Sequence, residues 1–376
     1  MTAATALARD WPLDPAAHWR AHQLWRRWRN QVSAARPAVP GSIAIVTDAW
    51  APQVNGVVRT LETTIAGLRA RGHRVDVIAP DQFRSLPCPT YPEIRLALLM
   101  PGEISRRLCD LAPEAIHIAT EGPLGLAARS YCLDTVTPFT TAYHTQFPQY
   151  LARRTRLPAA LFWPYIQWFH APAQRIMVAT EGVGRELHAH GLVRTHRWSR
   201  GVDLDCFTPD APPPPEYAAL PRPIQLYVGR VAVEKNLEAF LAAPYPGSKV
   251  VVGDGPARAA LAARFPAAHF LGPRSGAALA GCYAGADVFV FPSKTDTFGL
   301  VMVEALACGT PVAAFPVTGP RDIVTDQAGA LADDLGRAIG AALFSRREAC
   351  IARAAEFSWE RATDQFLSGL VAARRT

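Results

Sequence analysis

The sequence predicts an α/β protein made of two doubly wound domains, each built on a parallel sheet. Three observations support this fold class. Short runs of β-branched residues alternate with amphipathic helical stretches along most of the 376 residues. The alternation occurs in two series, separated by a proline-rich segment at 211–223. The chain is also long enough for two domains of ordinary size.

The first series occupies residues 41–210 and opens with a strand, a helix and a second strand. The run SIAIVTDA at 42–49 is apolar and β-branched, and an amphipathic stretch follows at 59–71. Gly72 is placed to end that helix, and HRVDVIAP at 73–80 predicts the next strand. This order forms a βαβ unit and therefore a parallel sheet. Further strands are expected at 115–120, 138–144 and 175–180.

Residues 211–223 read APPPPEYAALPRP, too rich in proline to continue a helix or a central strand. We predict an interdomain linker there. The second series follows over 224–357, and we expect a C-terminal helix over 358–376. Ligands of doubly wound sheets bind beside the carboxyl ends of the strands. We therefore expect the site in the cleft between the two domains.

The composition is that of a folded protein, with 49% hydrophobic and 19% charged residues. A net charge of +7 raises nucleic acid and anionic membranes as partners. The excess is concentrated in an N-terminal extension, 1–40, which holds six Arg, two Asp and four of the nine Trp. Because the charge is not spread along the chain, we expect no nucleic-acid partner.

The seven cysteines are odd in number, widely spaced and without a C-x-x-C pair. This pattern favours a reducing compartment over a disulfide framework or a zinc site. The chain begins without an apolar segment of signal-peptide type. Its uncharged stretch at 157–174 contains three prolines, so a membrane-spanning helix is not expected. These features predict a cytoplasmic protein.

The most informative stretch, 293–314, joins the end of a predicted strand to a polar loop and a helix. The helix is expected to begin near Phe298 and Gly299. The backbone N–H groups of Gly299, Leu300 and Val301 then lie at its positive end, where a diphosphate binds favourably.

Two carboxylates and two cations accompany this helix start. Asp296 precedes the helix and Glu304 follows eight residues later; carboxylates accept hydrogen bonds from vicinal diols. Arg230 and Lys235 follow another predicted strand and suit a departing diphosphate. An ordinary capped helix with two solvated acids, and a solvated loop with two cations, are the alternatives.

Two weaker signals lie in the first domain. Asn55 and Gly56 follow the first predicted strand, and a glycine there permits close approach of a ligand to the backbone. His144 lies at the end of the strand at 138–144, although a single His is more often structural. The GDGP at 253–256 predicts a turn and little more.

Together these motifs resemble the retaining GT-B glycosyltransferases of family four, over about residues 43–366. Members of this family have two Rossmann-like domains. The resemblance implies a nucleotide-sugar donor, no cofactor, no obligatory metal, and acceptor attack on the face that the diphosphate leaves. By its motifs, the catalytic residues are His144, Arg230, Lys235, Asp296 and Glu304. The implied donor-binding residues are Gly56, Arg230, Lys235, Asp296, Phe298, Gly299, Leu300, Val301 and Glu304.

The resemblance is greatest to the branch of bacterial glycolipid synthases and sulfoquinovosyl- and mannosyltransferases. Asp296 stands where the family usually has Glu, which shortens the reach to the sugar by one methylene. The favoured function is transfer of a hexose or hexuronic acid from a UDP-sugar to a membrane lipid such as diacylglycerol. A GDP-mannose-dependent α-mannosyltransferase acting on a lipid-linked or soluble saccharide is the alternative. A non-catalytic nucleotide-sugar sensor is a third.

Two basic, aromatic segments predict an anionic membrane surface as a further partner. Residues 19–29 alternate Trp and Arg, and residues 150–175 carry four Arg and several aromatic residues without an acid. They suggest a peripheral protein on the inner face of the cytoplasmic membrane. Alternatively, 161–169 packs in the core and 1–40 is a disordered tail.

Overall fold

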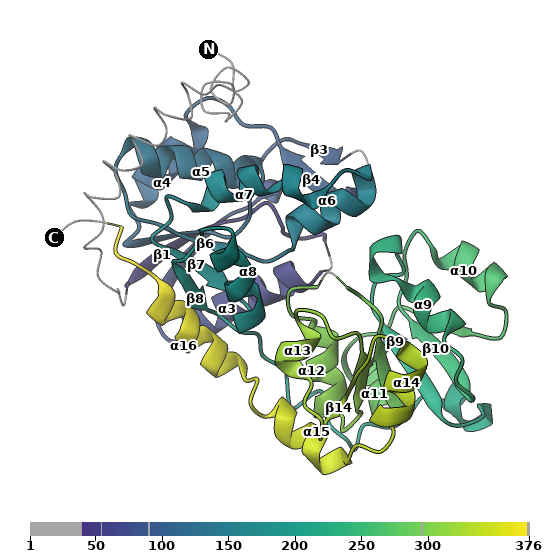
Figure 1. Ribbon diagram of the computed structural model, residues 1–376. Helices are drawn as coiled ribbons and strands as arrows, with labels where there is room; N and C mark the ends of the chain where they lie inside the picture. Colours follow the sequence, from purple (N-terminus) through teal and green to yellow (C-terminus); the bar gives the residue numbers. More distant parts are fainter. Residues whose placement is uncertain (1–39, 54, 89–90, 295, 374–376) are drawn as a thin grey trace. The chain divides into compact units, whose positions relative to one another are not determined.

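The computed structural model describes residues 40–53, 55–88, 91–294 and 296–373 (Figure 1). The chain divides into two compact units. Unit 1 extends to Trp198 and resumes at Thr363, and unit 2 comprises Ser199–Ala362. The predicted extension at 1–40 lies outside the described residues, except for Pro40.

Unit 1 contains a six-stranded sheet with the order β2-β1-β5-β6-β7-β8, in which every neighbouring pair is parallel. The central strand β1 pairs through Ile43 with both Val75 of β2 and Ala115 of β5. The strands are β1 (Ser42–Val46), β2 (Arg74–Ile78), β5 (Ala115–Ile118), β6 (Thr140–Tyr143), β7 (Arg175–Val178) and β8 (Thr195–Arg197). The predicted parallel sheet is therefore confirmed.

Alternation along β1 explains why helices cover both faces of this sheet. Ile43 and Ile45 face one core cluster, whereas Ala44 and Val46 face the other. Helices α4, α5 and α7 contribute to the second cluster, and α3 and α16 to the first (Figure 1). Besides the end of α16, the described helices of unit 1 are α3 (Gly56–Ala70), α4 (Glu103–Leu111), α5 (Pro123–Asp134), α6 (Phe147–Thr155), α7 (Trp163–His170) and α8 (Glu181–Ala189). Two further strands, β3 (Ser85–Cys88) and β4 (Tyr91–Ala97), form an antiparallel pair.

Unit 2 repeats the architecture with a sheet of order β11-β10-β9-β12-β13-β14, again parallel throughout. Its strands are β9 (Ile224–Val228), β10 (Ser248–Val252), β11 (His269–Gly272), β12 (Val288–Phe291), β13 (Val312–Ala314) and β14 (Gly329–Leu331). Its helices are α9 (Leu237–Ala242), α10 (Arg258–Arg264), α11 (Gly276–Ala284), α12 (Leu300–Ala307), α13 (Pro320–Ile323), α14 (Leu335–Ala342) and α15 (Arg347–Ala354). Residues of β9 and β12, such as Tyr227, Val288 and Val290, are buried in the core of unit 2.

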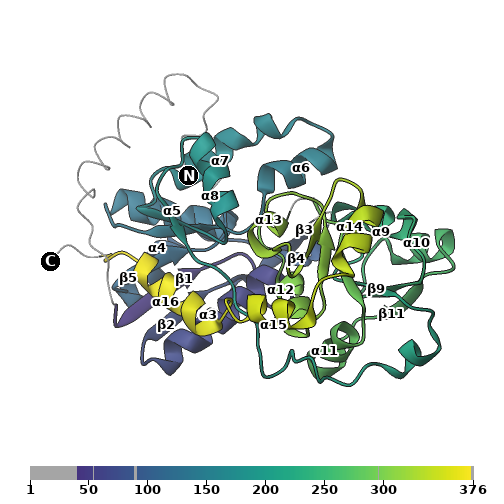
Figure 2. The ribbon, with the colours of Figure 1, turned by 60° about the horizontal axis from the view of Figure 1, so that its bottom comes forward.

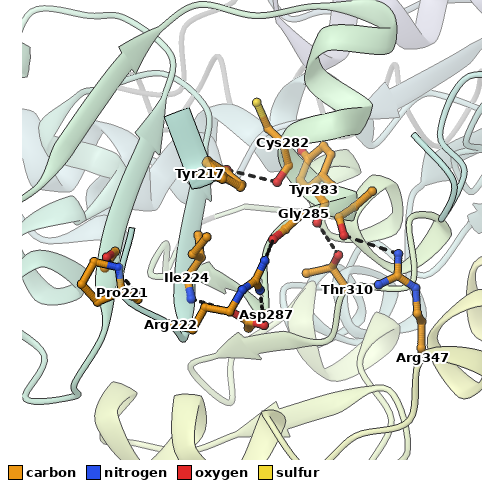
Figure 3. Close-up of polar contacts among 12 residues, drawn as sticks. Tyr217, Pro221, Arg222, Ile224, Cys282, Tyr283, Gly285, Asp287, Thr310 and Arg347 are labelled. Atoms are coloured by element: carbon orange, nitrogen blue, oxygen red, sulfur yellow. Dashed lines mark hydrogen bonds and ion pairs between the residues drawn. The ribbon is translucent and has the colours of Figure 1, made fainter. Parts of the chain in front are cut away.

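The proline-rich segment, expected as a linker between 41–210 and 224–357, lies inside unit 2. Tyr217 is buried there, and its hydroxyl donates to the Cys282 carbonyl at 3.1 Å (Figure 3). A Cβ at Gly281 would lie 2.1 Å from the Pro212 carbonyl oxygen. The segment forms a short 3-10 helix at Pro215–Ala219 and packs against α11. The division of the chain falls earlier, at Ser199.

The last helix, α16 (Trp359–Gly369), begins in unit 2 and continues into unit 1. Its unit 1 portion lies beside α3, where Arg71 pairs with Asp364 at 2.6 Å (Figure 2). Phe366 packs against Trp198 with ring centroids 4.7 Å apart, and both are fully buried. Among the described helices, none is long and apolar enough to cross a bilayer.

Candidate functional site

The loops after β9 and β12 meet at one edge of the unit 2 sheet. These strands are parallel neighbours, with Leu226 opposite Phe289. Their carboxyl ends therefore bring the loop that contains Arg230 and Lys235 next to the loop that contains Asp296. The two motifs predicted from separate parts of the sequence share this edge.

Lys235 and Asp296 form an ion pair across these loops. The Lys235 Nζ lies 2.6 Å from the Asp296 Oδ1, and the two side chains are 27% and 24% exposed. Asn236, in the left-handed region at φ 56°, donates from Nδ2 to the Pro292 carbonyl at 3.0 Å. Asn236 thus fastens one loop to the other and holds Lys235 in place, a role that the sequence analysis did not identify.

The backbone at Arg230 is held by a buried phenol. The Tyr227 hydroxyl donates to the Arg230 carbonyl at 2.9 Å. Burial, with a smaller contribution from the charge of Asp296, raises the pKa of Tyr227 well above its usual value, so the hydroxyl remains a donor. Gly229 adopts φ +146°, and a Cβ there would lie 2.9 Å from the Tyr227 hydroxyl. The loop that carries Arg230 is therefore built on a fixed turn.

Helix α12 begins as predicted, at the edge of the same loops. Gly299 occupies the N-cap position with φ 91°, and among the described residues no side chain caps this end. Leu300 and Val301 are only partly buried. A Cβ at Gly319 would lie 2.9 Å from the Asp296 carbonyl oxygen, so the neighbouring loop packs closely behind the site. The first turn presents backbone N–H groups and a positive helix end beside Lys235.

Two residues of this motif are more buried than a solvated loop and helix would allow. Glu304 is 2% exposed, and its Oε2 accepts from the Tyr283 hydroxyl at 3.0 Å. Phe298 is also buried and packs edge-on against Phe357 at 5.7 Å. The Phe298 ring therefore packs in the core of unit 2, and a contact between Phe298 and the donor stays a prediction. The alternative of two solvated acids does not fit a buried Glu304 and a paired Asp296.

The predicted site residues of unit 1 lie after its own strands. His144 directly follows β6, is 9% exposed, and packs edge-on against Trp198 at 5.3 Å. Asn55 caps α3, accepting from the N–H groups of Val57 and Val58 at 3.0 Å. Gly56 is the exposed first residue of that helix. The structure therefore gives Asn55 a capping role that the sequence analysis did not assign.

The GDGP turn has a structural explanation that the sequence did not reveal. A Cβ at Gly253 would lie 2.0 Å from the Gly229 carbonyl oxygen, and one at Gly255 would lie 2.4 Å from that of Val231. Both glycines also have positive φ. They permit the loops after β9 and β10 to touch backbone to backbone, and so support the turn that carries Arg230.

Unit 1 holds a buried carboxyl group at the end of β1. Asp48 accepts from the N–H of Leu124 at 2.8 Å, from that of Gly125 at 3.3 Å, and from the Thr120 hydroxyl at 2.9 Å. Burial raises the pKa of Asp48 to about 6 despite these hydrogen bonds. Two of these three donors lie in the first turn of α5 and the third precedes it, so Asp48 ties that helix to the sheet.

Comparisons with known proteins agree with this geometry. Residues 54–206 match Glycosyltransferase Family 4, and residues 222–344 match Glycosyl transferases group 1. A GDP-mannose-dependent alpha-mannosyltransferase of Mycobacterium tuberculosis is 33% identical over 306 residues, covering 75% of this chain and 81% of that protein. The sulfoquinovosyl transferase SQD2 of Arabidopsis thaliana is 31% identical over 300 residues, covering 73% and 59%. Sucrose-phosphate synthase from Thermosynechococcus elongatus has a similar fold, with a TM-score of 0.67, 21% identity and coverage of 86% and 97%.

The chain has two doubly wound units, and in unit 2 two cations and a helix N-terminus follow the carboxyl ends of neighbouring strands. Together with the matches above, this arrangement defines a glycosyltransferase with the GT-B fold. This is the fold class that the sequence predicted. The chain belongs to glycosyltransferase family four, as the family matches and the similarity to curated relatives show. Because its relatives are enzymes by name, the hypothesis of a non-catalytic sensor loses its support.

Proposed function

We propose that this glycosyltransferase transfers mannose from GDP-mannose with retention of configuration at the anomeric carbon. The observation that carries the transfer is the ion pair of Lys235 and Asp296 beside the uncapped start of α12. A cation, a carboxylate and the backbone N–H groups of the first turn of α12 thus lie after neighbouring strands of the unit 2 sheet. Two relatives, 33% and 35% identical, are named for GDP-mannose, which favours this donor over the UDP-sugar suggested by the sequence.

The diphosphate of the donor is bound by Arg230, Lys235 and the backbone N–H groups of Gly299, Leu300 and Val301. Asp296 accepts from a sugar hydroxyl, and Glu304 from the diol of the ribose. The bond from the anomeric carbon to the diphosphate breaks, and the acceptor hydroxyl bonds to that carbon on the same face. Its proton passes to the departing diphosphate oxygen. Stabilising the charge on that diphosphate is the main catalytic contribution of the protein.

Gly56 and His144 remain proposed donor contacts, on the strength of the family resemblance. His144 is held by Trp198 and stands at the end of a strand, where ligands of such sheets bind. For Gly56, exposure at the first turn of α3 is compatible with contact to a phosphate.

A membrane lipid or lipid-linked saccharide is the proposed acceptor class, with UDP-sugar transfer to a lipid as the second candidate. The similarity to a sulfoquinovosyl transferase favours that candidate. The predicted membrane segment 19–29 lies outside the described residues. Within 150–175, Trp163 and Phe169 are buried in the core. Trp168 is partly buried and packs under Arg129, at 4.0 Å.

Among the described residues of 150–175, a small exposed group is compatible with an anionic membrane. Leu157 and Leu161 are 49% and 62% exposed, and Arg156 beside them is exposed too. Apolar side chains next to a cation are the features that bind an anionic interface. We propose peripheral binding through these three residues.

A donor screen tests the proposed reaction. Purified enzyme is incubated with GDP-mannose, UDP-glucose, UDP-glucuronate or UDP-sulfoquinovose, together with diacylglycerol vesicles or soluble mannosides. Mass spectrometry identifies the product, and NMR gives its anomeric configuration. Consumption of GDP-mannose with an α-linked product supports the proposal. A lipid product formed only from a UDP-sugar supports the second candidate, and a β-linked product refutes retention.

A further inference from the structure

A buried tyrosine contacts the carboxylate that is proposed to bind the ribose. Glu304 lies in α12 and is 2% exposed, and Tyr283 at the end of α11 is fully buried. The Tyr283 hydroxyl donates to Glu304 Oε2 at 3.0 Å. Because a buried carboxylate is costly without hydrogen-bond donors, this contact matters more than a similar one at the surface.

The position of Tyr283 is itself fixed by its surroundings. Its carbonyl accepts from the Thr310 hydroxyl at 2.6 Å (Figure 3). Its ring packs edge-on against Phe289 at 5.6 Å and against Phe207 at 6.0 Å. The phenol is therefore held through its backbone carbonyl and through ring contacts with two aromatic residues.

The end of α11 around Tyr283 is equally well anchored. The Cys282 carbonyl accepts from Tyr217, and the Gly285 carbonyl accepts from Arg222 at 3.3 Å (Figure 3). The Ala284 carbonyl accepts from Arg347 at 3.4 Å. Together with the carbonyl of Tyr283 itself, the four consecutive carbonyls of residues 282–285 thus accept hydrogen bonds from side chains in distant parts of unit 2. Such anchoring gives a rigid support for a group that must hold another in one orientation.

We propose that Tyr283 is a positioning residue for Glu304, a role that rests on the proposed function of Glu304 in binding the donor. The hydrogen bond to Oε2 fixes the rotation of the carboxylate. It thereby sets the direction in which the carboxylate accepts from a vicinal diol of the nucleotide. The ligand class is a ribonucleoside diphosphate, and Glu304 distinguishes its intact ribose diol from a deoxyribose.

This role predicts a specific loss in the Tyr283→Phe variant. The ring and its packing remain, but the carboxylate loses the hydrogen bond from the Tyr283 hydroxyl. Affinity for GDP should fall about tenfold, a typical size for a hydrogen bond to a charged group. The ribose does not react, so the contact is equal in the ground and transition states. The KM for the donor should rise while kcat stays nearly constant.

The experiment compares GDP with 2′-deoxy-GDP and 3′-deoxy-GDP by titration calorimetry. The wild type should prefer GDP to at least one deoxy analogue by about tenfold, the size of one lost hydrogen bond to a charged group. In Y283F this preference should collapse, and in the double variant with Glu304→Gln the losses should not multiply. The matched control is Tyr245→Phe, which removes a partly buried phenol hydroxyl from the loop before β10 in the same unit, outside the proposed site, and should leave the preference unchanged.

The outcomes distinguish a failure of the proposed donor site from a failure of the proposed role of Tyr283. A wild type that binds no GDP or UDP refutes the donor site and the role of Tyr283 with it. A wild type that binds and discriminates, together with a Y283F variant that discriminates equally well, refutes only the role of Tyr283. Should Y283F not fold, Thr310→Val is measured instead, because it removes the hydroxyl that donates to the carbonyl of Tyr283. Unchanged discrimination in that variant also overturns the proposal.

Discussion

The contrast between two lysines of unit 2 provides the sharpest test of the site. Lys235 pairs with Asp296 at the proposed diphosphate site. Lys249 donates to the carbonyls of Leu241 and Ala243, at 2.8 and 2.6 Å, where α9 ends. Replacement of either lysine by Met removes one positive charge and keeps most of the aliphatic stem. The two variants therefore differ in location while matching in charge and size.

The two variants should lose different properties: Lys235→Met should lose activity, and Lys249→Met should lose stability. The Lys235 pair is about a quarter exposed, so Lys235→Met should change the free energy of unfolding by less than about 1 kcal/mol. Loss of a cation that stabilises the departing diphosphate should lower kcat by about 100-fold or more. Lys249→Met should lose about 1–2 kcal/mol of stability, because it leaves two carbonyls without their charged donor. Its kcat should remain close to the wild-type value.

The assay combines urea denaturation with initial rates, using the donor that the screen identifies. The reasoning predicts a crossed pattern, in which one variant loses activity and the other loses stability. If K235M kept its kcat, or lost as much stability as K249M with a proportional loss of activity, Lys235 would be a structural residue. The assignment of the diphosphate site would then be wrong.

Three further predictions concern unit 1, unit 2 and the membrane. Since burial raises the pKa of Asp48 to about 6, its protonated form favours the folded state, so stability should fall as pH rises. Relative to Asp48→Asn, the wild type should lose about 2 kcal/mol of unfolding free energy between pH 4 and 6; parallel profiles by denaturant titration would contradict this. Gly253→Ala should lower the melting temperature by several degrees through its backbone clash, whereas Gly72→Ala, which meets no atom within 4 Å, should lower it less. Leu161→Glu should reduce co-sedimentation with anionic vesicles at unchanged activity on a soluble acceptor, and undiminished sedimentation would argue against that surface.

Local sequence patterns determined much of this protein. Runs such as Ile43–Val46 are apolar on both alternating faces, which allows only a strand buried between two helical layers. The order of these runs implies parallel pairing, because a helix between two strands acts as a right-handed crossover that returns the chain in the same direction. The same order placed Lys235 and Asp296 at one strand edge, where the structure shows them paired. The GT-B fold and the closeness of Lys235 to Asp296 were therefore predictable from neighbours along the chain.

Contacts between distant residues decided the rest. The sequence shows Glu304 as an acid on a helix; its burial depends on Tyr283, 21 residues away, and on the strands that bring α11 and α12 together. Tyr217 joins the proline-rich segment to unit 2 through Cys282, 65 residues later, so the predicted linker is part of a domain. Likewise, the Phe298 ring is buried because it packs against Phe357, 59 residues later in the chain. Burial and hydrogen bonding are properties of packed surfaces, and no local pattern specifies which surfaces meet.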